Sequence, residues 1–168
     1  MSEKLTFIQS KIYSIEQLSK IKNVWKFHGL KIVFTNGCFD LLHAGHATYL
    51  AQAAALGNKL IVGLNSDESV KKLNKGKGRP IQSEDDRALI LASFYCVDAV
   101  VIFKEDNPEE IIKIIEPDVL VKGGDWKTEE IAGSKFVTAR GGTVVSLPFL
   151  EDRSTTLIES KIRKADIP

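Results

Sequence analysis

The sequence has few cysteines and no excess of either charge. Its two cysteines, Cys38 and Cys96, lie in apolar segments and lack the paired spacing of a zinc motif. A reduced protein is the simplest interpretation, although a single disulfide is also compatible with the sequence. Lys and Arg total 23 and Asp and Glu total 22, so composition favours neither nucleic acid nor an acidic membrane as a partner. Any anion site must therefore be local.

Long apolar runs are also absent. No stretch approaches the roughly 18 apolar residues that a membrane-spanning helix needs, and no secretory signal opens the chain. We therefore expect a cytoplasmic protein without a membrane or nucleic-acid partner. The chain has 168 residues, of which 43% are hydrophobic, which is enough for one domain with a sizeable core.

Short β-branched apolar segments alternate with helical patterns from residue 31 onward. Strands are expected at 31–35, 60–64, 98–103, 118–122 and 143–147. Helices are expected at about 44–56, 84–95, 108–115, 129–139 and 155–165. This alternation predicts an α/β fold, a single doubly wound, Rossmann-like domain with a five-stranded parallel sheet.

The first residues of the chain follow a helical pattern of their own. Ser14 is expected to cap a helix with an apolar stripe that includes Trp25, and His28 is expected to end it. We therefore expect an N-terminal helical extension at 1–29, followed by the main domain at 30–168. The apolar stripe offers a core surface or an interface, including that of a homodimer.

The residues that follow each strand are candidate site residues, because ligands of open α/β sheets bind beyond the carboxyl ends of the strands. His43 and His46 follow the first such strand, one helical turn apart at an expected helix start. There they can stabilise charge on a phosphate, and Gly45 permits close backbone approach. The alternative is a pair that only caps the helix or packs in the core. A zinc site is disfavoured, because no third ligand accompanies them.

Three further segments carry groups suited to phosphates or a base. Residues 71–80 form a long irregular loop rich in Lys and Arg, which is either a cationic flap or a solvated loop. Residues 154–156 are Ser-Thr-Thr at a helix start, which is either an anion site or an ordinary N-cap. Residues 122–125, Lys-Gly-Gly-Asp, form either a turn or a flat slot for a base. Walker A and Gly-x-Gly-x-x-Gly sequences are absent.

Three of these elements together resemble the nucleotidyltransferases of the cytidylyltransferase type. They are Gly37-Cys-Phe-Asp40, His43-Ala-Gly-His46 and Ser154-Thr-Thr156, and the resemblance covers roughly residues 30–165. Further segments resemble the adenylyltransferase half of bacterial ADP-heptose synthases, and these are residues 35–46, 78–80, 105–106, 121–125 and 130–134. The resemblance implies a nucleotidyltransferase domain at 30–168. It would transfer AMP from Mg²⁺-bound ATP to a heptose 1-phosphate, giving ADP-heptose and pyrophosphate for lipopolysaccharide or other surface-glycan precursors.

The same resemblance implies roles for individual residues. The expected catalytic residues are His43, His46 and Lys75. The expected nucleotide-binding residues are Thr35, Asn36, Gly37, Cys38, Phe39, Gly45, Lys77, Arg79, Lys122, Gly123, Gly124, Asp125, Ser154, Thr155 and Thr156. Asp40 and Asn65 are expected to contact the sugar phosphate, and Mg²⁺ is expected to accompany ATP without assigned protein ligands. The sequence departs from relatives that act on glycerol 3-phosphate, because Phe149 stands where those carry an arginine.

Two alternative functions stay open at this point. The first keeps the chemistry but uses CTP and glycerol 3-phosphate or another polyol or sugar phosphate. The second is a nucleotide-binding module without catalysis, which the histidine pair and the flap lysines disfavour. The two enzymes differ in the nucleotide that yields product, and the binding module differs from both in releasing no pyrophosphate.

Overall fold

The structure is a computed structural model that describes residues 2–73, 78–150 and 153–165. Within these ranges, six parallel strands form one sheet in the order β1-β4-β3-β2-β5-β6. The strands are β1 (Ile12–Tyr13), β2 (Ile32–Gly37), β3 (Lys59–Asn65), β4 (Ala99–Phe103), β5 (Val119–Gly123) and β6 (Thr143–Leu147). The predicted Rossmann-like α/β class is confirmed.

The prediction of five strands was wrong by one. The additional strand, β1, lies in the segment that the sequence indicated as helical, and its two residues pair with Val100 and Val101 of β4. Two residues are too few to show the alternation by which a strand is detected in sequence. The strand forms because the outer edge of β4 offers unpaired backbone groups, one of which, the N–H of Val100, donates to the carbonyl oxygen of Lys11 at 2.8 Å.

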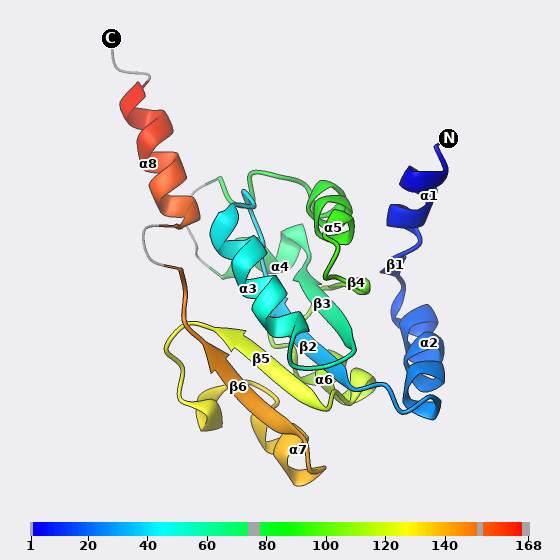
Figure 1. The fold of residues 1–168 in the computed structure, drawn as a ribbon. Helices are drawn as coiled ribbons and strands as arrows, with labels where there is room; N and C mark the ends of the chain where they lie inside the picture. The colour runs from blue at the N-terminus through cyan, green and yellow to red at the C-terminus, as the bar shows by residue number, and fades with distance from the viewer. Residues whose placement is uncertain (1, 74–77, 151–152, 166–168) are drawn as a thin grey trace.

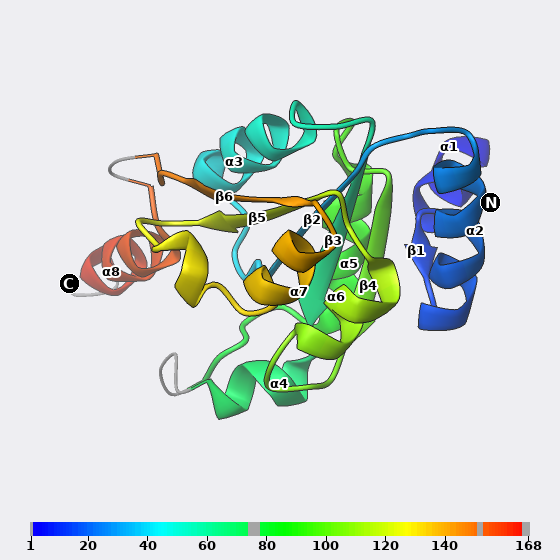
Figure 2. The same ribbon diagram turned by 90° about the horizontal axis from the view of Figure 1, so that it is seen from below.

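Helices cover both faces of the sheet (Figure 2). They are α1 (Glu3–Gln9), α2 (Ile15–Phe27), α3 (Ala44–Ala54), α4 (Asp67–Lys72), α5 (Glu84–Ser93), α6 (Glu109–Ile115), α7 (Ser134–Ala139) and α8 (Thr155–Ala165), with the 3₁₀ helix η1 at Thr128–Glu130. On one face, α3 and α5 pack around a core that includes Leu50 and Leu91. On the other face, α2, α6 and α7 pack around Ile112. None of the described helices has the length and apolar content to cross a membrane.

Several helix ends form as the sequence predicted. Ser14 caps α2 in a box with Gln17, and Ser83 caps α5 by accepting from the backbone of Asp86 at 3.2 Å. The helix expected at 129–139 is instead two short helices, because Gly133 between them has a φ of +84°. Helix α4 was not predicted, whereas α1 lies within the N-terminal extension that was expected to be helical. At the outer surface α2 exposes Phe27, so a homodimer through this helix stays a prediction.

Gly133 carries a testable prediction about packing. A Cβ there would lie 2.6 Å from Cδ1 of Ile112, whereas one at Gly141, with a similar φ of +81°, meets no atom within 4 Å in the described chain. Gly141→Ala is expected to cost about 1–2 kcal/mol of backbone strain. Gly133→Ala should cost about 1–3 kcal/mol more, from overpacking. Urea denaturation measures both, and equal shifts would contradict the proposed clash with Ile112.

The strand order fixes where a ligand can bind. Strand β2 pairs with β3 on one side and with β5 on the other, so the chain reverses direction across the sheet between β2 and β5. The loops that leave two such strands diverge to opposite faces and leave a crevice at their carboxyl ends. In Figure 1, α3 lies beside this part of the sheet, while α8 extends away from the end opposite to α1 and α2.

Candidate active site

The two histidines lie together at the start of α3. Nδ1 of His43 accepts from the N–H of Gly45 at 3.1 Å, and Nδ1 of His46 accepts from the N–H of His43 in a long bond of 3.4 Å. Their ring centroids are 4.0 Å apart. Since an accepting Nδ1 carries no proton, each neutral ring carries its proton on Nε2. The pair therefore caps the helix through Nδ1 and carries its protons on Nε2, the form that can donate to an oxygen acceptor.

The surroundings of His43 favour its neutral form. Burial of the ring lowers the pKa of His43, and the positive charge of Arg153 lowers it further. A neutral imidazole retains the Nδ1 lone pair that the cap uses, so the pKa shift and the hydrogen bond support the same tautomer. The positive end of the helix dipole at the start of α3 also favours an anion at this position.

The last residues of strand β2 point in different directions. The hydroxyl of Thr35 is buried and shares a hydrogen bond of 2.6 Å with the hydroxyl of Tyr49, so it faces α3 and not the crevice. Burial raises the pKa of Tyr49 to about 12, despite the opposing effect of this bond. Asn36 accepts from Nζ of Lys122 at 3.4 Å, which joins the ends of β2 and β5.

The loop between β2 and α3 is a tight turn. Phe39 and Leu41 have φ values of +47° and +48°, in the left-handed region that residues with a side chain rarely adopt. The Phe39 ring lies 5.6 Å from the ring of His46, and a Cβ at Gly37 would lie 3.1 Å from the Phe39 ring. Strained backbone of this kind persists only where surrounding contacts hold it, and it concentrates at functional sites.

Asp40 supplies those contacts. One carboxylate oxygen accepts from Nη1 of Arg79 at 2.8 Å and from the N–H of Ile81 at 2.9 Å, and the other accepts from the N–H of Gln82 at 3.1 Å. The carbonyl oxygen of Asp40 accepts from the hydroxyl of Thr155 at 2.9 Å. Both oxygens of the carboxylate are therefore engaged within the protein. The structure favours a positioning role for Asp40 over the predicted contact with the sugar phosphate.

Arg79 is held in the same cluster. Besides Asp40, its guanidinium contacts the carboxylate of Glu159 in α8, with Nε and Oε1 3.0 Å apart. Burial opposes its charge, but these two carboxylates raise the pKa of Arg79. Its charge is thus neutralised internally, which differs from the predicted contact with the nucleotide. The two expected flap lysines, Lys75 and Lys77, lie outside the described residues.

The contacts that Asp40 makes with Arg79, Ile81, Gln82 and Thr155 are called the Asp40 clamp below. Replacing Asp40 by asparagine tests this clamp. Asp40→Asn is expected to cost about 1–3 kcal/mol at neutral pH, because an amide cannot satisfy three buried donors with one oxygen. Burial alone would raise the pKa of Asp40, but the N–H of Ile81, the guanidinium of Arg79 and the N–H of Gln82 together lower it. The stabilisation is therefore present above the ordinary aspartate pKa and is lost as pH falls through the lowered, folded-state value.

The measurement is urea denaturation of wild type and Asp40→Asn between neutral and acidic pH. The stability difference should narrow as the wild-type carboxyl becomes protonated. Asp106→Asn is the matched control, because Asp106 pairs with Lys72 at 3.5 Å on the exposed surface and should contribute at most about 0.5 kcal/mol. Similar losses in both variants would contradict the clamp.

Arg87 is a site residue that was not among those predicted, and it is 0% exposed at the base of the site. Its guanidinium donates to the carbonyl oxygens of Cys38, Gln82 (3.1 Å) and Asn65 (3.0 Å) and to the carboxylate of Asp67 at 2.6 Å. These acceptors lie at the ends of β2 and β3 and at the starts of α4 and α5. One signal in the sequence was available: Arg87 stands four residues before Leu91, so it is a charged residue on the apolar stripe of α5, which indicates burial.

Asn65 is also part of the framework. Its side chain is buried, and Nδ2 donates to the hydroxyl of Ser69 at 2.9 Å, which in turn donates to the carbonyl oxygen of Glu105 at 3.2 Å. The amide thus stabilises the turn between β3 and α4. The structure does not bring this side chain to the histidine pair.

The start of α8 lies beside the start of α3. The hydroxyl of Ser154 accepts from the N–H of Leu157 at 3.2 Å, which is the predicted N-cap, and Thr156 is exposed. A Cβ at Gly45 would lie 2.9 Å from the ring of His43 and 3.2 Å from Cβ of Arg153. Only glycine permits this approach between the two helix starts. Two of the predicted phosphate-binding elements therefore converge.

The loop after β5 completes the crevice. Gly124 has a φ of +113°, and its N–H donates to the carbonyl oxygen of Leu147 at 2.8 Å, so the predicted turn is present. Gly123 is the last residue of β5, and the carboxylate of Asp125 is exposed. Lys122 reaches toward Asn36, as described above. The Lys-Gly-Gly-Asp segment thus lies across from the histidine loop at the switch point of the sheet.

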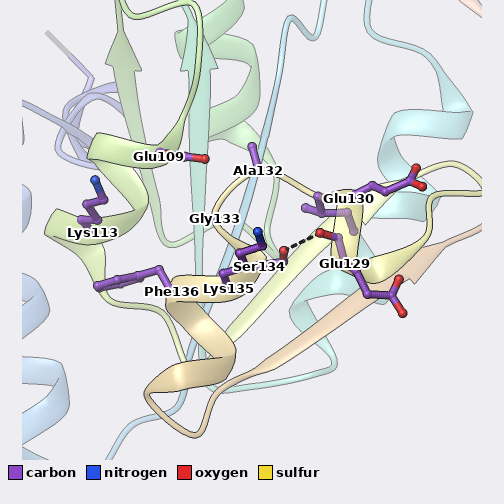
Figure 3. Close-up of a pocket in the computed structure, with 10 residues that line it drawn as sticks. Glu109, Lys113, Glu129, Glu130, Ala132, Gly133, Ser134, Lys135 and Phe136 are labelled. Carbon is purple, nitrogen blue, oxygen red and sulfur yellow. Dashed lines mark hydrogen bonds between the residues drawn. The ribbon is translucent and has the colours of Figure 1, made fainter.

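A hollow of about 310 Å³ lies between α6 and α7, on the face of the sheet opposite to α3 (Figure 3). Residues 130–134, one of the segments that resemble ADP-heptose synthases, line part of it. There the hydroxyl of Ser134 donates to the carbonyl oxygen of Glu129 at 3.1 Å, and Gly133 packs against Ile112. The segment therefore forms a packing turn that joins η1 to α7.

A parallel sheet with a histidine pair at the helix start beside its switch point is the arrangement of a nucleotide-binding α/β domain. The chain belongs to the cytidylyltransferase-like family of nucleotidyltransferases, whose model matches residues 34–161. The family predicted from the motifs is confirmed. The chain is 53% identical over 155 residues to the bifunctional protein HldE of Wolinella succinogenes, and 53% identical over 153 residues to that of Pseudomonas aeruginosa. These alignments cover 92% and 91% of the chain but 32% of each relative, so the chain spans about a third of their length.

Solved structures support the fold. A lipopolysaccharide core biosynthesis protein from Thermoplasma volcanium has a TM-score of 0.60 and 24% identity, covering 74% of this chain and all of that one. Pantoate-beta-alanine ligase from Francisella tularensis, solved with a nucleotide, has a TM-score of 0.56 and 16% identity, covering 93% of this chain and 78% of that one. At such low identity, these likenesses bear on the architecture alone.

Proposed function

We propose that this chain transfers AMP from ATP to a heptose 1-phosphate, D-glycero-D-manno-heptose 1-phosphate, forming ADP-heptose and pyrophosphate in the cytoplasm. The product would serve lipopolysaccharide or other surface-glycan synthesis. The observation that carries nucleotidyl transfer is the convergence of the starts of α3 and α8 around His43 and His46. The choice of sugar rests on the motifs that resemble ADP-heptose synthases and on the similarity to HldE proteins.

The proposed reaction is a single in-line displacement. An oxygen of the sugar phosphate attacks the α-phosphorus of ATP, the bond to the β-phosphate oxygen breaks, and pyrophosphate leaves with the electron pair. The Nε2–H groups of His43 and His46 donate to phosphate oxygens as negative charge grows on them. Ser154 to Thr156 hold the β- and γ-phosphates, and Lys75 with Lys77 neutralises the leaving pyrophosphate. No covalent intermediate with the protein is required.

Mg²⁺ is proposed to enter with ATP. Among the described residues there is no cluster of three His, Cys, Asp or Glu side chains arranged for a metal. Such a cluster is not needed, because Mg²⁺ commonly binds through substrate phosphates, water and one or two carboxylates. When bound, the ion would neutralise charge on the β- and γ-phosphates. Of the nearby carboxylates, that of Asp125 is exposed and that of Asp40 is engaged by Arg79.

A screen of pyrophosphate release tests the proposal. The purified chain is incubated with each of ATP and CTP and with heptose 1-phosphate, other sugar 1-phosphates or glycerol 3-phosphate. Release with ATP and the heptose phosphate, with ADP-heptose identified by mass spectrometry, is the expected result. Product from CTP and glycerol 3-phosphate alone would support the cytidylyltransferase alternative. ATP binding by calorimetry without pyrophosphate release from any acceptor would support the non-catalytic module.

A further inference from the structure

Two aromatic side chains stand exposed beside the glycine pair of the crevice. Phe149, just after β6, is 67% exposed, and Trp126, just after β5, is 51% exposed. Exposed rings are costly to solvate, so neighbouring ones in a crevice indicate a binding surface. In Figure 1 the chain after β6 rises past the end of β5 toward α8, which brings this region to the same end of the sheet as the start of α3.

Both rings are fixed against backbone. A Cβ at Gly123 would lie 2.7 Å from Cε1 of Phe149, and one at Gly124 would lie 3.1 Å from its Cε2, so the Phe149 ring rests directly on the glycine pair. Nε1 of Trp126 donates to the carbonyl oxygen of Gly123 at 3.0 Å. The backbone N–H of Trp126 donates to the hydroxyl of Ser146 at 3.2 Å, which donates in turn to the carbonyl oxygen of Gly124.

This rigidity explains why the loop carries two glycines. Any side chain at 123 would displace the Phe149 ring, and one at 124 would also approach within 3.0 Å of Trp126. A ring supported on one side by backbone and exposed on the other offers a flat apolar surface that is already ordered. Such a surface binds a flat aromatic ligand without a further entropic cost of ordering.

The two rings lie at the same end of the sheet as the histidine pair. Strand β5, which ends at Gly123, pairs with β2, whose loop carries the histidines, and Lys122 bridges to Asn36 across the gap. Phe149 lies five residues before Ser154 at the start of α8. A ligand with its phosphates at the histidine pair would therefore have its base directed toward Phe149 and Trp126.

We propose that Phe149 and Trp126 form an aromatic platform that stacks a purine base and sets the preference for ATP over CTP. The inference rests on the proposed function. Base–aromatic stacking contributes about 1–3 kcal/mol per base. The two fused rings of a purine overlap an aromatic side chain over a larger area than the single ring of a pyrimidine. The platform thus selects the size of the base, and it should favour GTP as well as ATP over CTP and UTP.

Calorimetric titration with ATP, GTP, CTP and UTP tests the platform without any sugar acceptor. Wild type should bind the two purine nucleotides more tightly. Phe149→Ala should weaken ATP binding about 5- to 140-fold and CTP binding much less. Phe149→Leu keeps an apolar side chain but loses the ring, so it should behave like Phe149→Ala. Phe27→Ala removes an even more exposed ring, 87% against 67% for Phe149, from α2 and should bind all four nucleotides as wild type does.

Tryptophan fluorescence gives a second measurement. The chain has two tryptophans, and in a Trp25→Phe background the remaining emission comes from Trp126. Saturating ATP should quench this emission more than saturating CTP. Unchanged discrimination between ATP and CTP in Phe149→Ala and Phe149→Leu would overturn the platform, as would rescue of ATP affinity by leucine.

The two proposals fail in different ways. If Phe149→Ala still transfers AMP to a sugar phosphate with the wild-type nucleotide preference, the platform is disproved and the proposed function stands. If purine nucleotides bind selectively through Phe149 but no acceptor yields pyrophosphate, the platform is confirmed and the proposed function is disproved. Because Phe149 is largely exposed, its variants should fold, and thermal unfolding checks this.

Discussion

Alanine at His43 or at His46 is expected to lower the turnover of adenylyl transfer by about two to three orders of magnitude, the usual loss when a donor to a developing charge is removed. The reason is the tautomer that the cap imposes. Because each Nδ1 accepts a backbone N–H, each neutral ring carries its proton on Nε2. KM for ATP should change far less than kcat, since the Nε2–H groups matter most when charge builds up on the phosphates.

Steady-state pyrophosphate release measures this effect, with two control variants. His28→Ala removes the third histidine, which lies at the end of α2, and should keep wild-type turnover. His43→Asn retains an oxygen that can accept from Gly45 but lacks the Nε2–H group, so it separates capping from catalysis. It should fold like wild type and be as inactive as His43→Ala. Wild-type turnover in both alanine variants would disprove the histidine assignment.

Removal of the Arg87 guanidinium is expected to produce the largest loss of stability. Arg87→Met keeps much of the side-chain volume but leaves the carbonyl oxygens of Cys38 and Asn65 and the carboxylate of Asp67 without their donor. Breaking a buried pair by removing one partner costs about 3–5 kcal/mol. Turnover should fall as well, because Cys38 begins the loop that carries the histidine pair.

Urea denaturation of Arg87→Met and Arg87→Lys provides the test. Lysine restores the charge but offers fewer directed donors, so its midpoint should lie between those of methionine and wild type. Arg140→Met is the control: Arg140 pairs with Glu116 at 2.9 Å but is half exposed, so its loss should cost at most about 1 kcal/mol. A wild-type midpoint for Arg87→Met would show that Arg87 does not hold these loops together.

Much of the fold could be predicted from local patterns. Strands β2 to β6 and helices α3, α5, α6 and α8 occupy the expected segments within a few residues, because apolar periodicity and caps are encoded by neighbouring residues. The failures are elements whose cause is distant in sequence. Strand β1 depends on the edge of β4. The break in the helix at 129–139 depends on Gly133 meeting Ile112 of α6.

The candidate site shows the same division. The sequence predicted the histidine pair and the Ser-Thr-Thr cap, which are local, and the structure brings them together. It could not show that the carboxylate of Asp40 is occupied by Arg79, since 39 residues separate the two. The contacts of Arg87 are likewise long-range, and only its place on an apolar stripe hinted at burial.

The clamp at Asp40 has a thermodynamic consequence. Its carboxylate holds the segment from Arg79 to Gln82, its carbonyl oxygen holds Thr155, and its backbone lies in the histidine loop. A ligand that orders any one of these elements therefore lowers the cost of ordering the other two. This coupling is reciprocal: if ordering one element strengthens ligand contacts at a second by some factor, ordering the second strengthens contacts at the first by the same factor. The proposed triphosphate substrate should therefore stabilise the histidine loop, the segment from Arg79 to Gln82 and the start of α8 together.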